Sequence, residues 1–205
     1  MQSIKNYKPL FYFFLIGILP GVAFAHHPNG YKLPNSLFEG LLSGLGHPVI
    51  GLDHLVFIIG IGLLSYLMRQ RFTVPFVFII GTLVGAITHL NSVSIPFSES
   101  LIAISIVLLG FVLIYKSEKT LSTVWYFSLT GAGILHGYAY GESIVGAEVT
   151  SLGAYLIGFS AIQLSISLIV GVLCLWLNKS QSIPANNLSR LYGGVAVCTG
   201  TFFLV

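Results

Sequence analysis

The stretch His47-Pro48-Val49-Ile50-Gly51-Leu52-Asp53-His54 places two histidines and a carboxylate inside an apolar segment that covers residues 36–68. In a regular helix, His47 and His54 would share one face but lie about 10 Å apart along the axis, too far to ligate one ion. Pro48 removes a backbone donor and Gly46 and Gly51 flank it, so we expect the helix to be broken between Gly46 and Gly51. Such a break can bring the polar side chains together.

The composition around this stretch is that of an integral membrane protein. Of 205 residues, 55% are hydrophobic and only 7% are charged, with a mean hydropathy of +0.92, whereas about a quarter of the residues in a soluble domain are charged. Six apolar segments can be drawn, at 36–68, 73–91, 97–115, 121–140, 151–177 and 188–205. We therefore predict an all-α integral membrane protein with six transmembrane helices, the first of them broken.

The first 25 residues have the order of a secretory signal peptide. Two lysines precede a short apolar run at 10–19, and Ala23-Phe24-Ala25 ends the segment. Cleavage after Ala25 would leave a single domain over residues 26–205 that begins with His26 and His27. The alternative is an uncleaved signal anchor, which the short apolar run disfavours because a span needs about 20 residues.

The basic residues predict the orientation, because Lys and Arg are retained on the cytoplasmic side of a bilayer. With an exported N-terminus, the first, third and fifth connections are cytoplasmic. They contain Arg69, Arg71, Lys116, Lys119, Lys179 and Arg190, while the connections near 92–97 and 141–150 contain no Lys or Arg. We expect a multi-pass protein of the bacterial inner membrane with both mature ends outside. So few charges cannot form a nucleic-acid-binding face, and the expected partner is the lipid bilayer.

The other membrane-embedded histidines map to the same outer half as the first motif. Ionisable side chains cost roughly 3 kcal/mol at the centre of a bilayer and therefore mark sites or pathways. Imidazole and carboxylate without thiolate suit divalent nickel, cobalt, zinc or copper. We predict a metal site made by His47, Asp53, His54 and His136, with His89 and Glu142 as further candidates and external His26 and His27 gathering the ion.

Some of these residues have a second interpretation. A lone histidine in a membrane helix, such as His89, more often bonds to a neighbouring helix than to a metal. Asp53 can bind metal directly, can accept the second N–H of a ligating imidazole and fix its tautomer, or can form a packing ion pair with His54. Tyr138 and Tyr140 are typical of interfacial aromatic residues at the end of a helix.

The motifs resemble those of the HupE/UreJ family, membrane proteins associated with hydrogenase and urease and regarded as nickel or cobalt permeases. The resemblance rests on His47-Pro48-x-x-Gly51-x-Asp53-His54 and on His136-Gly137-x-Ala139-x-Gly141, and it extends to 43–47, 104–110 and 155–159. It implies that His47, Asp53, His54 and His136 form the metal site. The chain departs from the family pattern at Tyr140, where a second histidine is usual, at Glu142, which stands one residue early, and at Gln163 and Ser167, which replace a later histidine.

We therefore predict an uptake permease for a divalent metal ion, not an enzyme, with nickel or cobalt favoured by the resemblance and no prosthetic group. The sequence has no Walker motif, so it does not encode direct ATP coupling. Two other classes stay open. Three histidines and an aspartate can hold a catalytic zinc ion in an intramembrane hydrolase, although the H-E-x-x-H motif is absent. An accessory or sensor protein could bind metal without transporting it.

Overall fold

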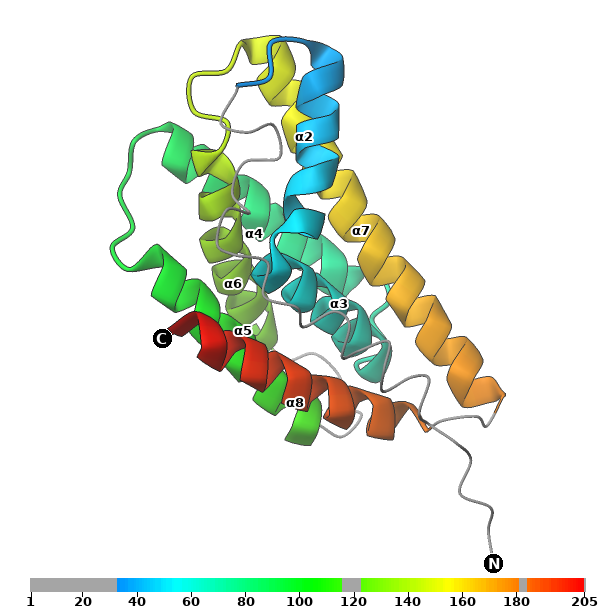
Figure 1. Ribbon diagram of the computed structural model, residues 1–205. Helices are drawn as coiled ribbons and strands as arrows, with labels where there is room; N and C mark the ends of the chain where they lie inside the picture. The colour runs from blue at the N-terminus through cyan, green and yellow to red at the C-terminus, as the bar shows by residue number, and fades with distance from the viewer. Residues whose placement is uncertain (1–32, 116–122, 181–183, 205) are drawn as a thin grey trace, which may run out of the picture.

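The computed structural model describes residues 33–115, 123–180 and 184–204, and within these ranges the secondary structure is entirely helical (Figure 1). This confirms the all-α class. The predicted first segment appears as two helices and each of the other five as one, within a few residues of the expected bounds. The helices are α2 (Leu37–Ile50), α3 (Leu52–Leu67), α4 (Thr73–Leu90), α5 (Ser98–Tyr115), α6 (Thr123–Glu142), α7 (Val149–Lys179) and α8 (Ala185–Leu204).

Several of these helices can cross a bilayer. By length and composition, α4, α5 and α7 qualify among the described residues, and the bent pair α2 and α3 adds a fourth if it is one span. The helices α6 and α8 coincide with predicted segments, but their glycine, hydroxyl and amide side chains lower their hydropathy. The membrane class is supported, whereas the count of six spans stays a prediction. The predicted signal peptide, residues 1–25, lies outside the described residues.

The break in the first segment falls at Gly51, where α2 and α3 meet at 81°. Pro48 lies in the last turn of α2, and Gly51 has an extended backbone whose N–H donates to the His47 carbonyl at 3.1 Å. A Cβ atom on Gly51 would lie 2.8 Å from Cδ2 of His54. The predicted break is therefore confirmed. It places His47 in the last turn of α2, and Asp53 and His54 in the first turn of α3.

The helix α3 forms the centre of the molecule. Most of its side chains are buried, including Ile58, Ile61 and Leu64, and it contacts α5, α7 and α8. Around it the helices pair closely: Figure 1 shows α2 running beside the first part of α7 and α8 beside α5, while α4 packs on α6. Glycines allow these approaches, as is usual between membrane helices. A Cβ atom on Gly44 would meet the Tyr155 backbone, and one on Gly137 would meet the Thr82 backbone.

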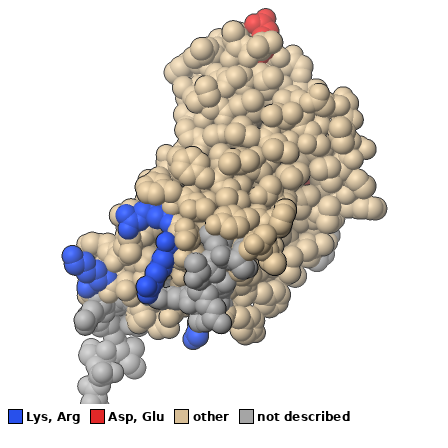
Figure 2. Space-filling model, turned by 180° about the vertical axis from the view of Figure 1, so that it is seen from behind, with Lys and Arg blue, Asp and Glu red and all other residues tan. Residues whose placement is uncertain are grey.

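The charged side chains separate toward the two ends of the bundle. In Figure 2 the visible basic side chains gather at one end and the visible acidic side chain lies at the other. Arg69 and Arg71 follow α3, Lys179 ends α7, and all of them are exposed. This separation agrees with the predicted orientation, which itself stays a prediction.

Candidate metal centre

Three of the predicted histidines converge where α2, α3 and α6 meet. The side chains of His47, His54 and His136 are all buried, with at most 1% of their surface exposed. The ring centroids of His47 and His54 lie 5.7 Å apart, and those of His54 and His136 lie 5.1 Å apart. Asp53 is also buried, and its Oδ2 lies 3.9 Å from Nδ1 of His54. The two sequence motifs therefore form one polar cluster, although 82 residues separate His54 from His136.

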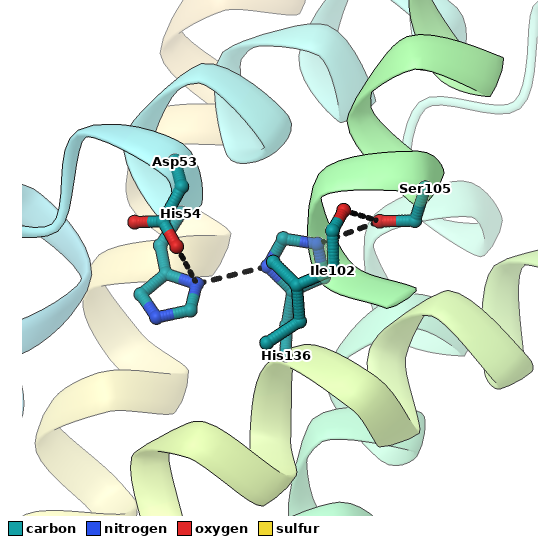
Figure 3. A network of polar contacts seen from close by, with 5 residues as sticks. All are labelled: Asp53, His54, Ile102, Ser105 and His136. Atoms are coloured by element: carbon teal, nitrogen blue, oxygen red, sulfur yellow. Dashed lines mark hydrogen bonds and ion pairs between the residues drawn. The ribbon is translucent and has the colours of Figure 1, made fainter. Parts of the chain in front are cut away.

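A chain of hydrogen bonds orients His54 (Figure 3). The Ser105 hydroxyl on α5 donates to the Ile102 carbonyl at 2.7 Å, so its oxygen accepts from Nε2 of His136 at 3.1 Å. In a neutral His136 the lone pair then lies on Nδ1, which is 2.9 Å from Nδ1 of His54. With this assignment of His136, Nδ1 of His54 donates in the bond, because neutral imidazole has one donor and one acceptor nitrogen. The lone pair of His54 is therefore on Nε2.

A second set of hydrogen bonds orients His47. Its Nδ1 lies 3.0 Å from the Ser143 hydroxyl and 3.2 Å from the Tyr155 hydroxyl. Both hydroxyls also donate to the Tyr140 carbonyl, at 3.0 and 2.9 Å. The two hydroxyl oxygens also lie 2.9 Å from each other. We assign both of their protons to the Tyr140 carbonyl, and in this assignment Nδ1 of His47 donates to the hydroxyl oxygens and its lone pair lies on Nε2. Both imidazoles of the first motif thus present the same nitrogen as a possible ligand.

The same geometry separates two possible roles of Asp53. An imidazole that binds metal usually donates its second N–H to a carboxylate, carbonyl or water. For His54 that acceptor is His136, because the 3.9 Å distance to the Asp53 carboxylate exceeds hydrogen-bond length. A buried carboxylate is stable in an apolar interior only beside a cation or hydrogen-bond donors. The carboxylate lies within ion-pair distance of His54, so a packing ion pair and direct ligation of a metal both stay open for Asp53.

Tyr140 is the residue that sequence reasoning missed. Its side chain is fully buried and its ring contacts both His47 and His54, with centroid distances of 5.1 and 4.6 Å. The interpretation of Tyr140 as an interfacial aromatic is therefore wrong, because the ring packs inside the cluster. Its departure from the family's histidine pattern was the signal that could have identified it. Tyr138, by contrast, is only partly buried and its hydroxyl accepts from the backbone N–H of Ile95 at 3.2 Å.

The remaining predicted residues lie apart from this cluster or outside the described ranges. The His89 ring packs on Tyr138 with a centroid distance of 4.4 Å. Glu142 is exposed at the end of α6, and its neighbour Ser143 is the residue that reaches His47. His26 and His27 lie outside the described residues. A further departure, Gln163, is buried on α7 about two turns beyond Tyr155, where its Nε2 donates to the Phe159 carbonyl at 3.0 Å.

The side chains of the predicted ligands lie close together, but their donor atoms do not point toward one common position. Across the described ranges, no three His, Cys, Asp or Glu side chains form a group arranged to hold a metal ion. One reason is visible in Figure 3, where the Nδ1 atoms of His54 and His136 face each other in their hydrogen bond. Ligation by His136 would require that bond to open. The metal site therefore stays a prediction, and the structure provides its starting arrangement.

The fold and the cluster define a class: a helical membrane protein with buried histidines beside a broken helix. The chain belongs to the HupE/UreJ family, because the family model described as "HupE / UreJ protein" matches residues 14–203. It is similar to the protein named HupE from Rhizobium leguminosarum bv. viciae, with 25% identity over 190 residues that cover 91% of this chain and 92% of that relative. No solved structure matches the chain. The resemblance predicted from the two motifs is confirmed.

Proposed function

We propose that the protein is an uptake permease for a divalent transition-metal ion, with nickel or cobalt as its substrate. The observation that carries the proposal is the burial of His47, His54 and Asp53 together at the break between α2 and α3. Discontinuous membrane helices are a common location for the substrate sites of transporters. Membership of the HupE/UreJ family supports transport over the other classes.

In this proposal the ion is bound by Nε2 of His47, Nε2 of His54 and the Asp53 carboxylate. Nitrogen and oxygen donors of this kind suit nickel and cobalt, and the aspartate charge offsets part of the cost of removing water from a divalent cation. His136 holds the His54 ring through the Nδ1 bond, and it adds a nitrogen ligand if that bond opens. His26, His27, His89 and Glu142 would serve the approach from outside.

Metal uptake by intact cells tests the proposed function. Cells that express the protein should accumulate nickel or cobalt above cells without it, and each metal should compete with the other. His54→Ala, inserted in the membrane at the same level, should lose this accumulation, because it removes a ligand. Equal accumulation with and without the protein would contradict the permease.

The same cells and the purified protein separate the other two classes. An accessory or sensor protein would bind nickel after purification without raising cellular uptake. An intramembrane zinc-dependent hydrolase would cleave a peptide or ester substrate when zinc is added, and His54→Ala would abolish that cleavage. We expect neither nickel binding without uptake nor zinc-dependent cleavage.

A further inference from the structure

The Tyr140 hydroxyl is a buried polar group that the hydrogen-bond network of the fold does not use. The oxygen has no hydrogen-bond partner in the part of the chain that the structure describes, and the side chain is fully buried. Other buried tyrosines differ: the hydroxyl of Tyr155 donates to a backbone carbonyl at 2.9 Å and that of Tyr192 to another at 2.8 Å. Burying a hydroxyl without a partner costs free energy, so each such group needs an explanation.

The position of Tyr140 indicates what the missing partner is. Its ring contacts His47 and His54, the two imidazoles whose Nε2 atoms carry lone pairs. Its own carbonyl accepts hydrogen bonds from the Ser143 and Tyr155 hydroxyls, which hold the backbone in place. Phenylalanine would fill the same space without an unused oxygen. The buried Tyr140 hydroxyl is therefore best explained by a ligand that enters the histidine cluster and forms a hydrogen bond with the hydroxyl oxygen.

We propose that Tyr140 contacts the substrate: its hydroxyl oxygen accepts a hydrogen bond from a water molecule that the metal ion keeps when it is bound by His47, Asp53 and His54. This inference rests on the proposed function. The ligand is thus a partly hydrated divalent cation. Because a metal-bound water is a strong donor, the bond forms only when the ion is present, and the hydroxyl is left without a partner when it is not.

The inference predicts a dependence on the metal. Zinc favours tetrahedral sites of four ligands, so beside the three protein ligands proposed here it would keep a single water. Nickel with nitrogen and oxygen ligands favours a tetragonal geometry that leaves positions for water. The hydroxyl of Tyr140 therefore stabilises bound nickel more than bound zinc, and it acts as a selectivity determinant at a position where the family pattern has histidine.

Tyr140→Phe tests the inference, with Tyr192→Phe as the matched control. The full chain is purified in detergent, and the nickel dissociation constant is measured by calorimetry together with the thermal midpoint of the metal-free protein. We expect Tyr140→Phe to weaken nickel binding about 10–100-fold and zinc binding less, with the thermal midpoint unchanged or higher, since only an unused hydroxyl is lost. Tyr192→Phe should leave nickel binding unchanged and lower the thermal midpoint, because it removes the buried hydrogen bond that the Tyr192 hydroxyl donates to the Val56 carbonyl.

Two results overturn the inference. One is a nickel dissociation constant for Tyr140→Phe within about twofold of the wild type. The other is a fall in nickel affinity that comes with a lower thermal midpoint, which would show that the hydroxyl stabilises the fold. His54→Ala distinguishes this failure from failure of the proposed function. If His54→Ala loses nickel and Tyr140→Phe does not, only the inference fails; if both bind nickel as the wild type does, the proposed site fails as well.

Discussion

His54 receives its orientation from His136 and Ser105, and His47 receives its orientation from Ser143 and Tyr155. In both cases a bond to Nδ1 leaves the lone pair on Nε2. A neutral imidazole must present its lone pair to bind a metal. The bonds at Nδ1 therefore leave Nε2 as the nitrogen that can bind the ion. In the proposed site, hydroxyls and a second imidazole would orient the two ligating imidazoles, a role that a carboxylate has in many metal sites. The carboxylate of Asp53 would then bind the ion directly.

This assignment makes Asp53→Asn an informative variant. The amide keeps an oxygen acceptor but loses the charge. Since Asp53 is not the hydrogen-bond partner of His54, we expect Asp53→Asn to lose nickel binding as completely as His54→Ala does, measured by equilibrium titration of the purified protein. A loss of only about 10–100-fold would contradict direct ligation, because that is the usual effect of removing a residue that orients a ligand.

Tyr155→Phe tests the network that holds His47. The variant removes one of the two hydroxyls at Nδ1 of His47 and leaves Ser143. We expect nickel affinity to fall about tenfold, and we expect no further fall when Tyr155→Phe is added to His47→Ala. Exposed Tyr126→Phe is the control and should bind as the wild type does. Additive losses in the double variant would show that Tyr155 acts through general packing and not through His47.

The sequence patterns predicted the helices and the break more completely than they predicted the residues that meet at the site. Apolar runs separated by polar residues predicted each helix of the described ranges, and Pro48 with Gly51 predicted the break, because both signals are local. The pairing of α4 with α6 and of α2 with α7 has no local signal, since any helix rich in small residues can approach any other. Tyr140 was misassigned for the same reason: its burial depends on α2, α3 and α7, which are distant in sequence.

The contact between α4 and α6 carries a prediction of its own. A Cβ atom on Gly137 would overlap the Thr82 backbone, whereas one on Gly131 of the same helix meets nothing within 4 Å. Gly137→Ala should force α6 away from α4, displace the adjacent His136, and lower both the thermal midpoint and nickel affinity. Gly131→Ala should leave both unchanged or raise the midpoint, since alanine favours helix. Equal behaviour of the two variants, measured by thermal unfolding and nickel titration, would contradict the packing.

At the scale of the whole molecule, the separation of charge was predictable because basic residues recur in alternate connections. Arg69 and Arg71 follow α3 and Lys179 ends α7, whereas Glu148 precedes α7 and Glu142 ends α6. In Figure 2 the visible basic side chains lie at the opposite end of the bundle from the visible acidic one. The orientation in a membrane is not determined by the fold alone. The charge bias predicts it, because Lys and Arg are retained on the cytoplasmic side.

Cysteine labelling tests this orientation. In a background with Cys174→Ser and Cys198→Ser, single cysteines are introduced at Glu148 and at Ser180, both exposed at opposite ends of α7. Intact cells are then treated with a membrane-impermeant thiol reagent. We expect the cysteine at 148 to react from outside and the one at 180 to react only after lysis. Labelling of the 180 site in intact cells would reverse the topology.

The central claim is that an ion passes through the protein by way of the His47, Asp53 and His54 cluster. Its most direct test is nickel influx into sealed liposomes that contain only the purified protein and an entrapped metal-sensitive dye. We predict saturable influx for the wild type and none above protein-free liposomes for His47→Ala and His54→Ala, both reconstituted at equal density. Influx through these variants at the wild-type rate under limiting nickel, or no influx through the wild type, would contradict the account.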